Sequence, residues 1–203
     1  MRLVRTVLLA AVLALVASQS AAQTIDPRPL QIVDDTHRAI LKIQQNSATL
    51  DAAAEARIAA VLDPVTHFFK IAETILELYA EFWTIGEWRQ LSGVLGKLIR
   101  HETLWKMRPY RVERYEPVST ETVFRTVVVK VRAHSQGEAV PITYWLDRED
   151  GAWFIVGYAV DGVNVVDHYQ EHYHALFKQG FLDPIIRQLE RDISAYATQK
   201  TGQ

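Results

Sequence analysis

The sequence contains no cysteine. This excludes disulfides, thiolate metal ligands, a cysteine nucleophile and lipid attachment through an N-terminal cysteine. An excess of positive charge is also missing, since 22 Lys and Arg against 24 Asp and Glu give a formal net charge of −2. A basic excess is the usual signature of nucleic-acid binding, so we expect no nucleic-acid partner.

Apolar runs long enough to cross a bilayer are also absent. The run over residues 7–17 is shorter than the roughly 20 residues of a membrane-spanning helix. Arg2 and Arg5 precede it, and the small residues Ser20-Ala21-Ala22 follow it. This pattern predicts a cleavable secretory signal over residues 1–22 and an exported, soluble single domain over residues 23–203. An uncleaved membrane anchor is the alternative.

The first half of the mature chain has helical periodicity. With 49% apolar and 23% charged residues the composition is that of a globular domain. Helices are predicted over residues 30–44, 51–62, 68–83 and 84–99, the last with Thr84 and Glu87 spaced as a capping box. The segment over residues 68–83 is apolar around most of its circumference, so we expect other elements to cover it on several sides.

After Pro109 the periodicity changes to alternation. Val123, Val127, Val129 and Val131 are predicted to share one face of a strand, and residues 140–146 form the next. Asp150-Gly151 predicts a hairpin turn into residues 153–160, an apolar strand expected at the centre of the sheet. Two helices follow, over residues 163–178 and from residue 183 onward. Helices and strands are segregated along the chain, which predicts an α+β fold with about four antiparallel strands.

Two patterns raise the possibility of catalysis. His168, Glu171 and His172 fit the H-x-x-E-H pattern of inverted zinc peptidases, with Glu190 as the candidate third ligand. A small cavity enzyme would instead use a carboxylate or histidine with a perturbed pKa, and the candidates for that role are His134, Asp147 and Asp161. A solvated helix face and exposed strand ends explain the same residues. The surplus of apolar residues fits a binding cavity better, with a filled core as the alternative.

The second half of the chain resembles a known family. The residues that carry the resemblance are 140–144 (VPITY), 153–156 (WFIV), 160–166 (VDGVNVV), Tyr169, Tyr173, Gly180 and Leu182, with a weaker match at 84–91 (TIGEWRQL). They are similar to the MlaC / toluene-tolerance auxiliary family, the periplasmic phospholipid-binding component of the system that maintains outer-membrane lipid asymmetry. Gly157, Asn164 and Gln170 stand where the family usually has Asp, Ser and Arg, which indicates a divergent member.

The resemblance implies an NTF2-like fold in which helices and a curved antiparallel sheet enclose an apolar pocket. It implies no catalysis, no metal and no cofactor, with phospholipid as cargo and a hopanoid-like lipid as the alternative. The implied partners are an inner-membrane ABC transporter complex and an outer-membrane lipoprotein–porin complex, and the implied location is the periplasm. Residues expected to line the pocket are Phe69, Ile75, Tyr79, Val127, Val129, Val131, Ile142, Tyr144, Val156, Tyr158, Val163, Val166, Tyr169 and Tyr173.

Overall fold

A computed structural model describes residues 26–47, 51–107 and 111–198. The predicted signal peptide over residues 1–22 lies outside these residues. The helices are α2 (Arg28–Gln45), α3 (Ala52–Leu62), α4 (Phe68–Leu76), the 3-10 helix η1 (Glu77–Phe82), α5 (Ile85–Lys106), α6 (Val165–Phe177) and α7 (Leu182–Thr198). The strands are β1 (Arg114–Val123), β2 (Thr126–Ser135), β3 (Glu138–Glu149), β4 (Ala152–Val160) and β5 (Val163–Asn164). The predicted α+β class is confirmed.

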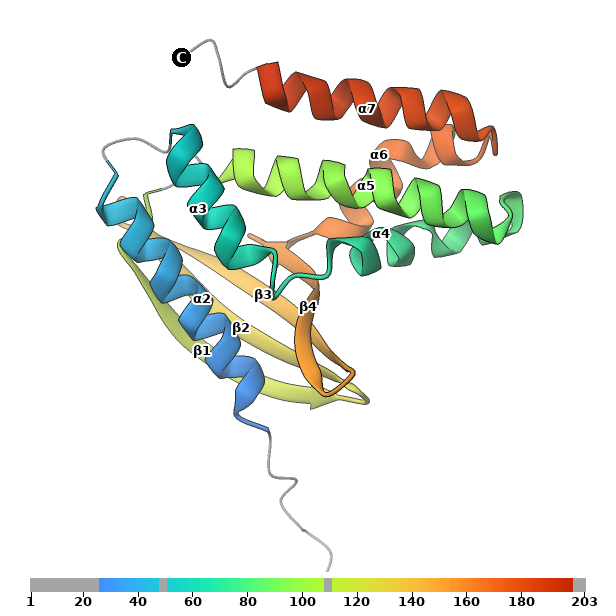
Figure 1. Ribbon diagram of the computed structural model, residues 1–203. Coiled ribbons are helices and arrows are strands. Elements are labelled where there is room, and N and C mark those ends of the chain that lie inside the picture. Colours follow the sequence, from blue (N-terminus) through green and yellow to red (C-terminus); the bar gives the residue numbers. More distant parts are fainter. Residues whose placement is uncertain (1–25, 48–50, 108–110, 199–203) are drawn as a thin grey trace, which may run out of the picture.

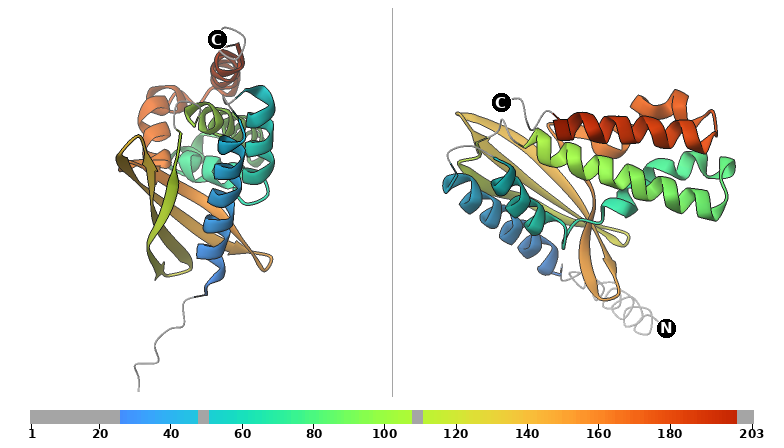
Figure 2. Two further views of the ribbon diagram at one scale, coloured as in Figure 1. Left: turned by 90° about the vertical axis from the view of Figure 1, so that its left-hand side faces the viewer. Right: turned by 45° about the horizontal axis from the view of Figure 1, so that its top comes forward.

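The strands form one antiparallel sheet in the order β1-β2-β3-β4-β5. Helix α2 runs along one face of the twisted sheet, whereas α4, α5, α6 and α7 form a separate helical layer at one end of it (Figures 1 and 2). In the described part of the chain, no helix has both the length and the apolar character that crossing a membrane requires.

Polar side chains fix where three of the helices begin. The Thr84 hydroxyl accepts a hydrogen bond from the Glu87 backbone N–H and the Glu87 carboxylate accepts one from the Thr84 N–H, which confirms the capping box of α5. Asp51 caps α3 through the Ala54 N–H. Asn164 caps α6, because its side-chain oxygen accepts a hydrogen bond from the Val166 N–H. Asn is about as good an N-cap as Ser, so the departure from the family pattern at this position keeps the cap.

The predicted helix over residues 68–83 is only partly correct. The α-helix ends at Leu76 and continues as η1, which leaves Leu78 exposed by 68% and Phe82 by 41%. Contacts with the C-terminal part of the chain hold Tyr79 of η1 and Trp83, which follows η1, in inward-facing positions. The Tyr79 hydroxyl lies 2.9 Å from His174 Nδ1, and the indole N–H of Trp83 donates to the Gly180 carbonyl at 3.2 Å.

The first hairpin corrects the predicted strand that contained Val123. A turn at Phe124 and Arg125 separates β1 from β2, so Val123 ends one strand and Val127 belongs to the next. Phe124 has a φ of 56° and is 99% exposed. Bulky residues rarely adopt this backbone conformation, and the turn has no Gly, Pro or Asn to reveal it in the sequence.

The expectation that residues 153–160 form a central strand is only partly correct, because β4 lies between β3 and β5 but β5 is very short. On one side β4 pairs with β3 along its length, whereas on the other it pairs with the two-residue strand β5 and forms one parallel bridge between Ile155 and Thr66. The segment between α3 and α4 covers this edge at Ile155, because the Ile155 N–H donates to the Val65 carbonyl at 2.8 Å and the His67 N–H donates to the Ile155 carbonyl at 2.9 Å. This cover explains how an apolar strand is accommodated near the edge of the sheet.

The buried apolar side chains form three clusters rather than one. The largest joins α4, α5, α6 and α7, and it includes the fully buried Ile75, Leu95 and Phe177. A second lies between α2 and the sheet, and a third joins α2, α3 and the end of α5. Helix α2 and the helical layer are therefore anchored mainly in different clusters, and the third cluster connects them.

Replacing Thr84 with Ala removes the side-chain half of the capping box. We expect the free energy of unfolding to fall by about 1 kcal/mol, because an orphan N–H at the start of α5 loses its partner. Urea denaturation measures the change. The matched control Thr84→Ser keeps the hydroxyl and should unfold near the wild-type midpoint; equal destabilisation by both substitutions would show that the cap does not contribute.

Candidate functional site

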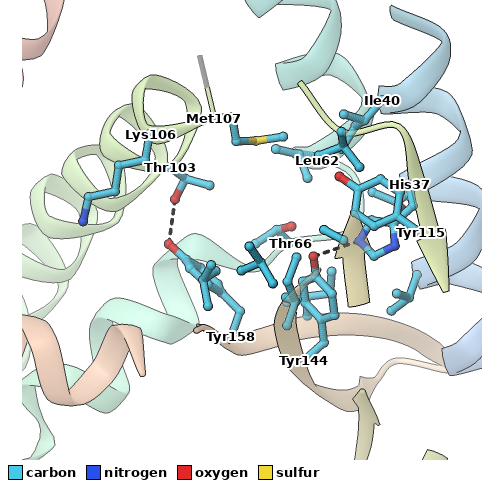
Figure 3. Close-up of a pocket in the computed structure, with 18 of the residues that line it drawn as sticks. His37, Ile40, Leu62, Thr66, Thr103, Lys106, Met107, Tyr115, Tyr144 and Tyr158 are labelled. Carbon is cyan, nitrogen blue, oxygen red and sulfur yellow. Dashed lines mark hydrogen bonds between the residues drawn. The ribbon is translucent and has the colours of Figure 1, made fainter. Parts of the chain in front are cut away.

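A cavity of about 430 Å³ lies between α2, the end of α5 and the inner face of the sheet (Figure 3). Its volume is within the range of roughly 300–1,000 Å³ that is typical of small-molecule sites. The lining is mostly apolar and is made of Val33, Thr36, His37, Ile40, Gln44, Leu62, Thr66, Phe68, Thr103, Trp105, Lys106, Met107, Val112, Tyr115, Ala133, Ser135, Val140, Ile142, Tyr144, Ile155, Tyr158 and Val160.

Two hydrogen bonds connect the helical walls of the cavity to the sheet. His37 Nε2 on α2 lies 2.9 Å from the Tyr144 hydroxyl on β3. On the opposite side, Thr103 Oγ1 on α5 lies 2.7 Å from the Tyr158 hydroxyl on β4 (Figure 3). Each pair joins side chains far apart in the sequence, so the cavity exists only when both helices are docked on the sheet.

Burial keeps the polar groups of these walls uncharged. Desolvation lowers the pKa of His37 to about 4, although the charge of Asp34 acts in the opposite direction. Desolvation raises the pKa of Tyr115 and that of Tyr158 to about 12. At neutral pH the imidazole and the phenols therefore offer hydrogen bonds without charge.

The one cation among the lining residues, Lys106, already has a counter-ion. Its Nζ lies 2.6 Å from the Glu102 carboxylate, which also accepts a hydrogen bond from Tyr169. Burial opposes ionisation of Glu102, but the hydrogen bonds from Lys106 and Tyr169 and the nearby charges outweigh it, so its pKa is lowered. The pair thus adds little net charge to the cavity.

The structure places the predicted pocket residues in several regions. Ile142, Tyr144 and Tyr158 line the cavity. Val127 and Val156 line a second, more polar groove of about 680 Å³ beside the hairpin tips. Val129 and Val131 lie in the core between α2 and the sheet. Those that belong to or pack against the helical core are Ile75, Tyr79, Val166, Tyr169 and Tyr173. Phe69 and Val163 are exposed by 36% and 60%. Contact of these residues with a lipid stays a prediction.

Sequence reasoning missed the contribution of α2 and of the segment that ends at Phe68. The sequence did carry a signal for α2, because His37 and Gln44 share its buried stripe with Val33 and Ile40. Polar side chains within an apolar stripe are more costly to bury in a core than at the wall of a cavity. No comparable sequence pattern marks Thr66, which lines the cavity because the segment between α3 and α4 passes beside it.

The residues considered for catalysis do not lie in the cavity lining. His134 contacts Glu116, Asp147 accepts a hydrogen bond from Thr126, and Asp161 occupies an exposed turn. The rings of His168 and His172 lie side by side on α6 with centroids 6.2 Å apart. Across residues 26–47, 51–107 and 111–198, no three His, Asp or Glu side chains are grouped as a metal site would require.

Comparison with known proteins places this cavity in a family. The family model described as MlaC protein matches residues 31–191. The chain belongs to the MlaC family. The match includes α2, which forms one wall of the cavity, as well as the sheet and most of α7. No curated protein matches the sequence.

A solved structure has the same fold as this MlaC chain. The phospholipid-binding protein from Ralstonia solanacearum, in complex with a phospholipid, superposes with a TM-score of 0.68 and 14% sequence identity. The alignment covers 82% of this chain and 97% of that chain. The fold predicted from the resemblance is therefore confirmed, with a short fifth strand that the sequence did not reveal.

The buried His37 makes the stability depend on pH. Its pKa in the folded chain is about 4, below the ordinary 6.5, so the unfolded chain binds a proton first. Stability should therefore fall as the pH is lowered from about 6.5 to 4, by about 3 kcal/mol from this group. Urea midpoints measured across this interval test the expectation. In His37→Gln the contribution should vanish, whereas parallel pH profiles for the two proteins would contradict it.

Proposed function

We propose that this MlaC-family chain binds a phospholipid, with the acyl chains inside the cavity and the charged headgroup in solvent. The observation that carries the proposal is the mostly apolar cavity between α2, α5 and the sheet, whose one lysine is paired with Glu102. The relative from Ralstonia solanacearum, which shares the fold, is a phospholipid-binding protein in complex with a phospholipid. Apolar walls suit hydrocarbon, and an uncharged interior disfavours a phosphate.

The energetics of such a site suit a carrier. Burial of a methylene is worth about 0.8 kcal/mol, so two acyl chains of roughly thirty methylenes would gain about 24 kcal/mol relative to water. That exceeds the ceiling of about 18–21 kcal/mol for non-covalent affinity. The relevant exchange is instead with another apolar compartment, so most of the gain cancels and lipid can be both taken up and released.

We further propose that the protein is a periplasmic shuttle. The mature chain would carry lipid between an inner-membrane ABC transporter complex and an outer-membrane lipoprotein–porin complex, without enzymatic activity. The family membership and the basic, apolar and small-residue pattern over residues 1–22 support export to that compartment.

Native mass spectrometry of the protein purified from the periplasm, followed by solvent extraction, tests the proposed function. We expect a single class of lipid to co-purify with the protein and fragmentation to identify it as phospholipid. A hopanoid in its place would overturn the assignment of the cargo. A protein that stays empty after incubation with phospholipid vesicles would contradict phospholipid binding itself.

A bulky substitution inside the cavity should displace the lipid. Ile142 lines the cavity, whereas its neighbour Thr143 lies on the same strand outside the lining. We expect Ile142→Trp to lower the bound lipid at least tenfold, because the indole fills space that an acyl chain needs, and Thr143→Trp to retain it. Lipid per protein is measured by extraction and mass spectrometry. Wild-type occupancy in folded Ile142→Trp would show that the lipid binds elsewhere.

A further inference from the structure

Three tyrosines from different strands bring hydroxyl groups to the cavity. They are Tyr115 on β1, Tyr144 on β3 and Tyr158 on β4, and their hydroxyls point into the interior in Figure 3. The rest of the wall is mainly apolar, so these groups mark the places where a bound molecule can form hydrogen bonds. Which of them can donate one follows from the partners that they already have.

The Tyr158 hydroxyl has no proton left for a ligand. Thr103 Oγ1 donates its only proton to the Ile99 carbonyl at 2.6 Å, because a carbonyl oxygen can only accept. Tyr158 must therefore be the donor in its 2.7 Å bond with Thr103. The Tyr144 hydroxyl already has a partner in His37 Nε2 at 2.9 Å, to which it donates its proton when the imidazole carries its own on Nδ1.

Tyr115 differs from the other two tyrosines. Its ring is stacked on the His37 imidazole, with centroids 3.7 Å apart and planes inclined by 10°, so its position is fixed. Its hydroxyl has no hydrogen-bond partner among the residues that the structure describes. Tyr115 is half-buried and lines the cavity, so a ligand oxygen at this position can accept the proton of its hydroxyl in place of water.

The charge balance of the cavity restricts what that oxygen is. His37 is neutral above pH 4 and Lys106 is neutralised by Glu102, so no free cation is present in the lining to compensate a buried phosphate or carboxylate. A neutral acceptor fits these surroundings. In a diacyl phospholipid, the neutral acceptors nearest the acyl chains are the ester carbonyl oxygens.

We propose that the Tyr115 hydroxyl donates a hydrogen bond to an ester carbonyl of the bound lipid, so that the cavity prefers ester-linked to ether-linked chains. The inference rests on the proposed phospholipid binding and adds a basis for selecting among lipids. The acyl chain would then lie beyond this contact, between α2 and the inner face of the sheet, while the phosphate remains outside. Tyr115 acts here as a specificity-determining residue.

A competition within one sample tests the proposal. The protein is incubated with vesicles that contain equal amounts of diester phosphatidylethanolamine and its diether analogue with chains of the same length. Native mass spectrometry then gives the ratio of the two complexes. We expect the wild type to favour the ester lipid about five- to tenfold, the equilibrium value of one hydrogen bond of about 1 kcal/mol or slightly more.

The substitution Tyr115→Phe removes only the hydroxyl and should bring the ratio to about one while the variant still binds both lipids. Tyr79→Phe is the matched control, because the Tyr79 hydroxyl contacts His174 in the helical layer and Tyr79 does not line the cavity. This control should keep the wild-type ratio.

The outcomes separate this inference from the proposed function. Equal binding of both lipids by the wild type would overturn the role of the ester while phospholipid binding stands. An undiminished preference in Tyr115→Phe would overturn the role of Tyr115. Failure of the wild type to bind either lipid would overturn the proposed function together with the inference.

Discussion

The cavity exists because helices α2 and α5 are each hydrogen-bonded to the sheet but leave space between them and its inner face. Tyr144 on β3 bonds His37 of α2, and Tyr158 on β4 bonds Thr103 of α5. Protein interiors pack densely, and an apolar void loses the dispersion contacts that would fill it. A space of this size therefore persists only if its walls are anchored elsewhere. The hydrogen bonds connect the walls, and the clusters of buried side chains anchor the helices.

The division of the apolar residues into clusters meets this requirement. Helix α5 is held by α4, α6 and α7 through side chains such as Leu95, while α2 is held against the sheet through Val33. Some of these side chains also form the cavity wall, since Val33 and Ile155 of the cluster between α2 and the sheet line it. Buried side chains of the helical layer such as Leu95 lie outside the lining, so a ligand can enter or leave with little change in that core.

The polar groups that line the cavity are mostly neutral. Neutral phenols, hydroxyls and a neutral imidazole line the cavity, whereas the charge of Lys106 is balanced by Glu102, which also binds Tyr169 of α6. Such an interior disfavours ions but accepts hydrocarbon and neutral oxygen. Combined with membership of the MlaC family, this explains why the proposed function is binding rather than chemistry.

The sequence by itself determined the local structure and the family. Periodicity predicted the helices and the α+β order, Thr84 and Glu87 predicted the start of α5, and Asp150-Gly151 predicted a hairpin, because these signals act between residues close in the chain. The turn at Phe124 escaped prediction because its side chain does not favour the backbone that it adopts. Only the tertiary structure decided the cavity. Periodicity shows that a face is buried but not what buries it, so Tyr79 in a filled core and Tyr144 in a cavity wall look alike in the sequence. The distinction arises from the docking of α2 and α5 on the sheet, which joins residues more than fifty positions apart.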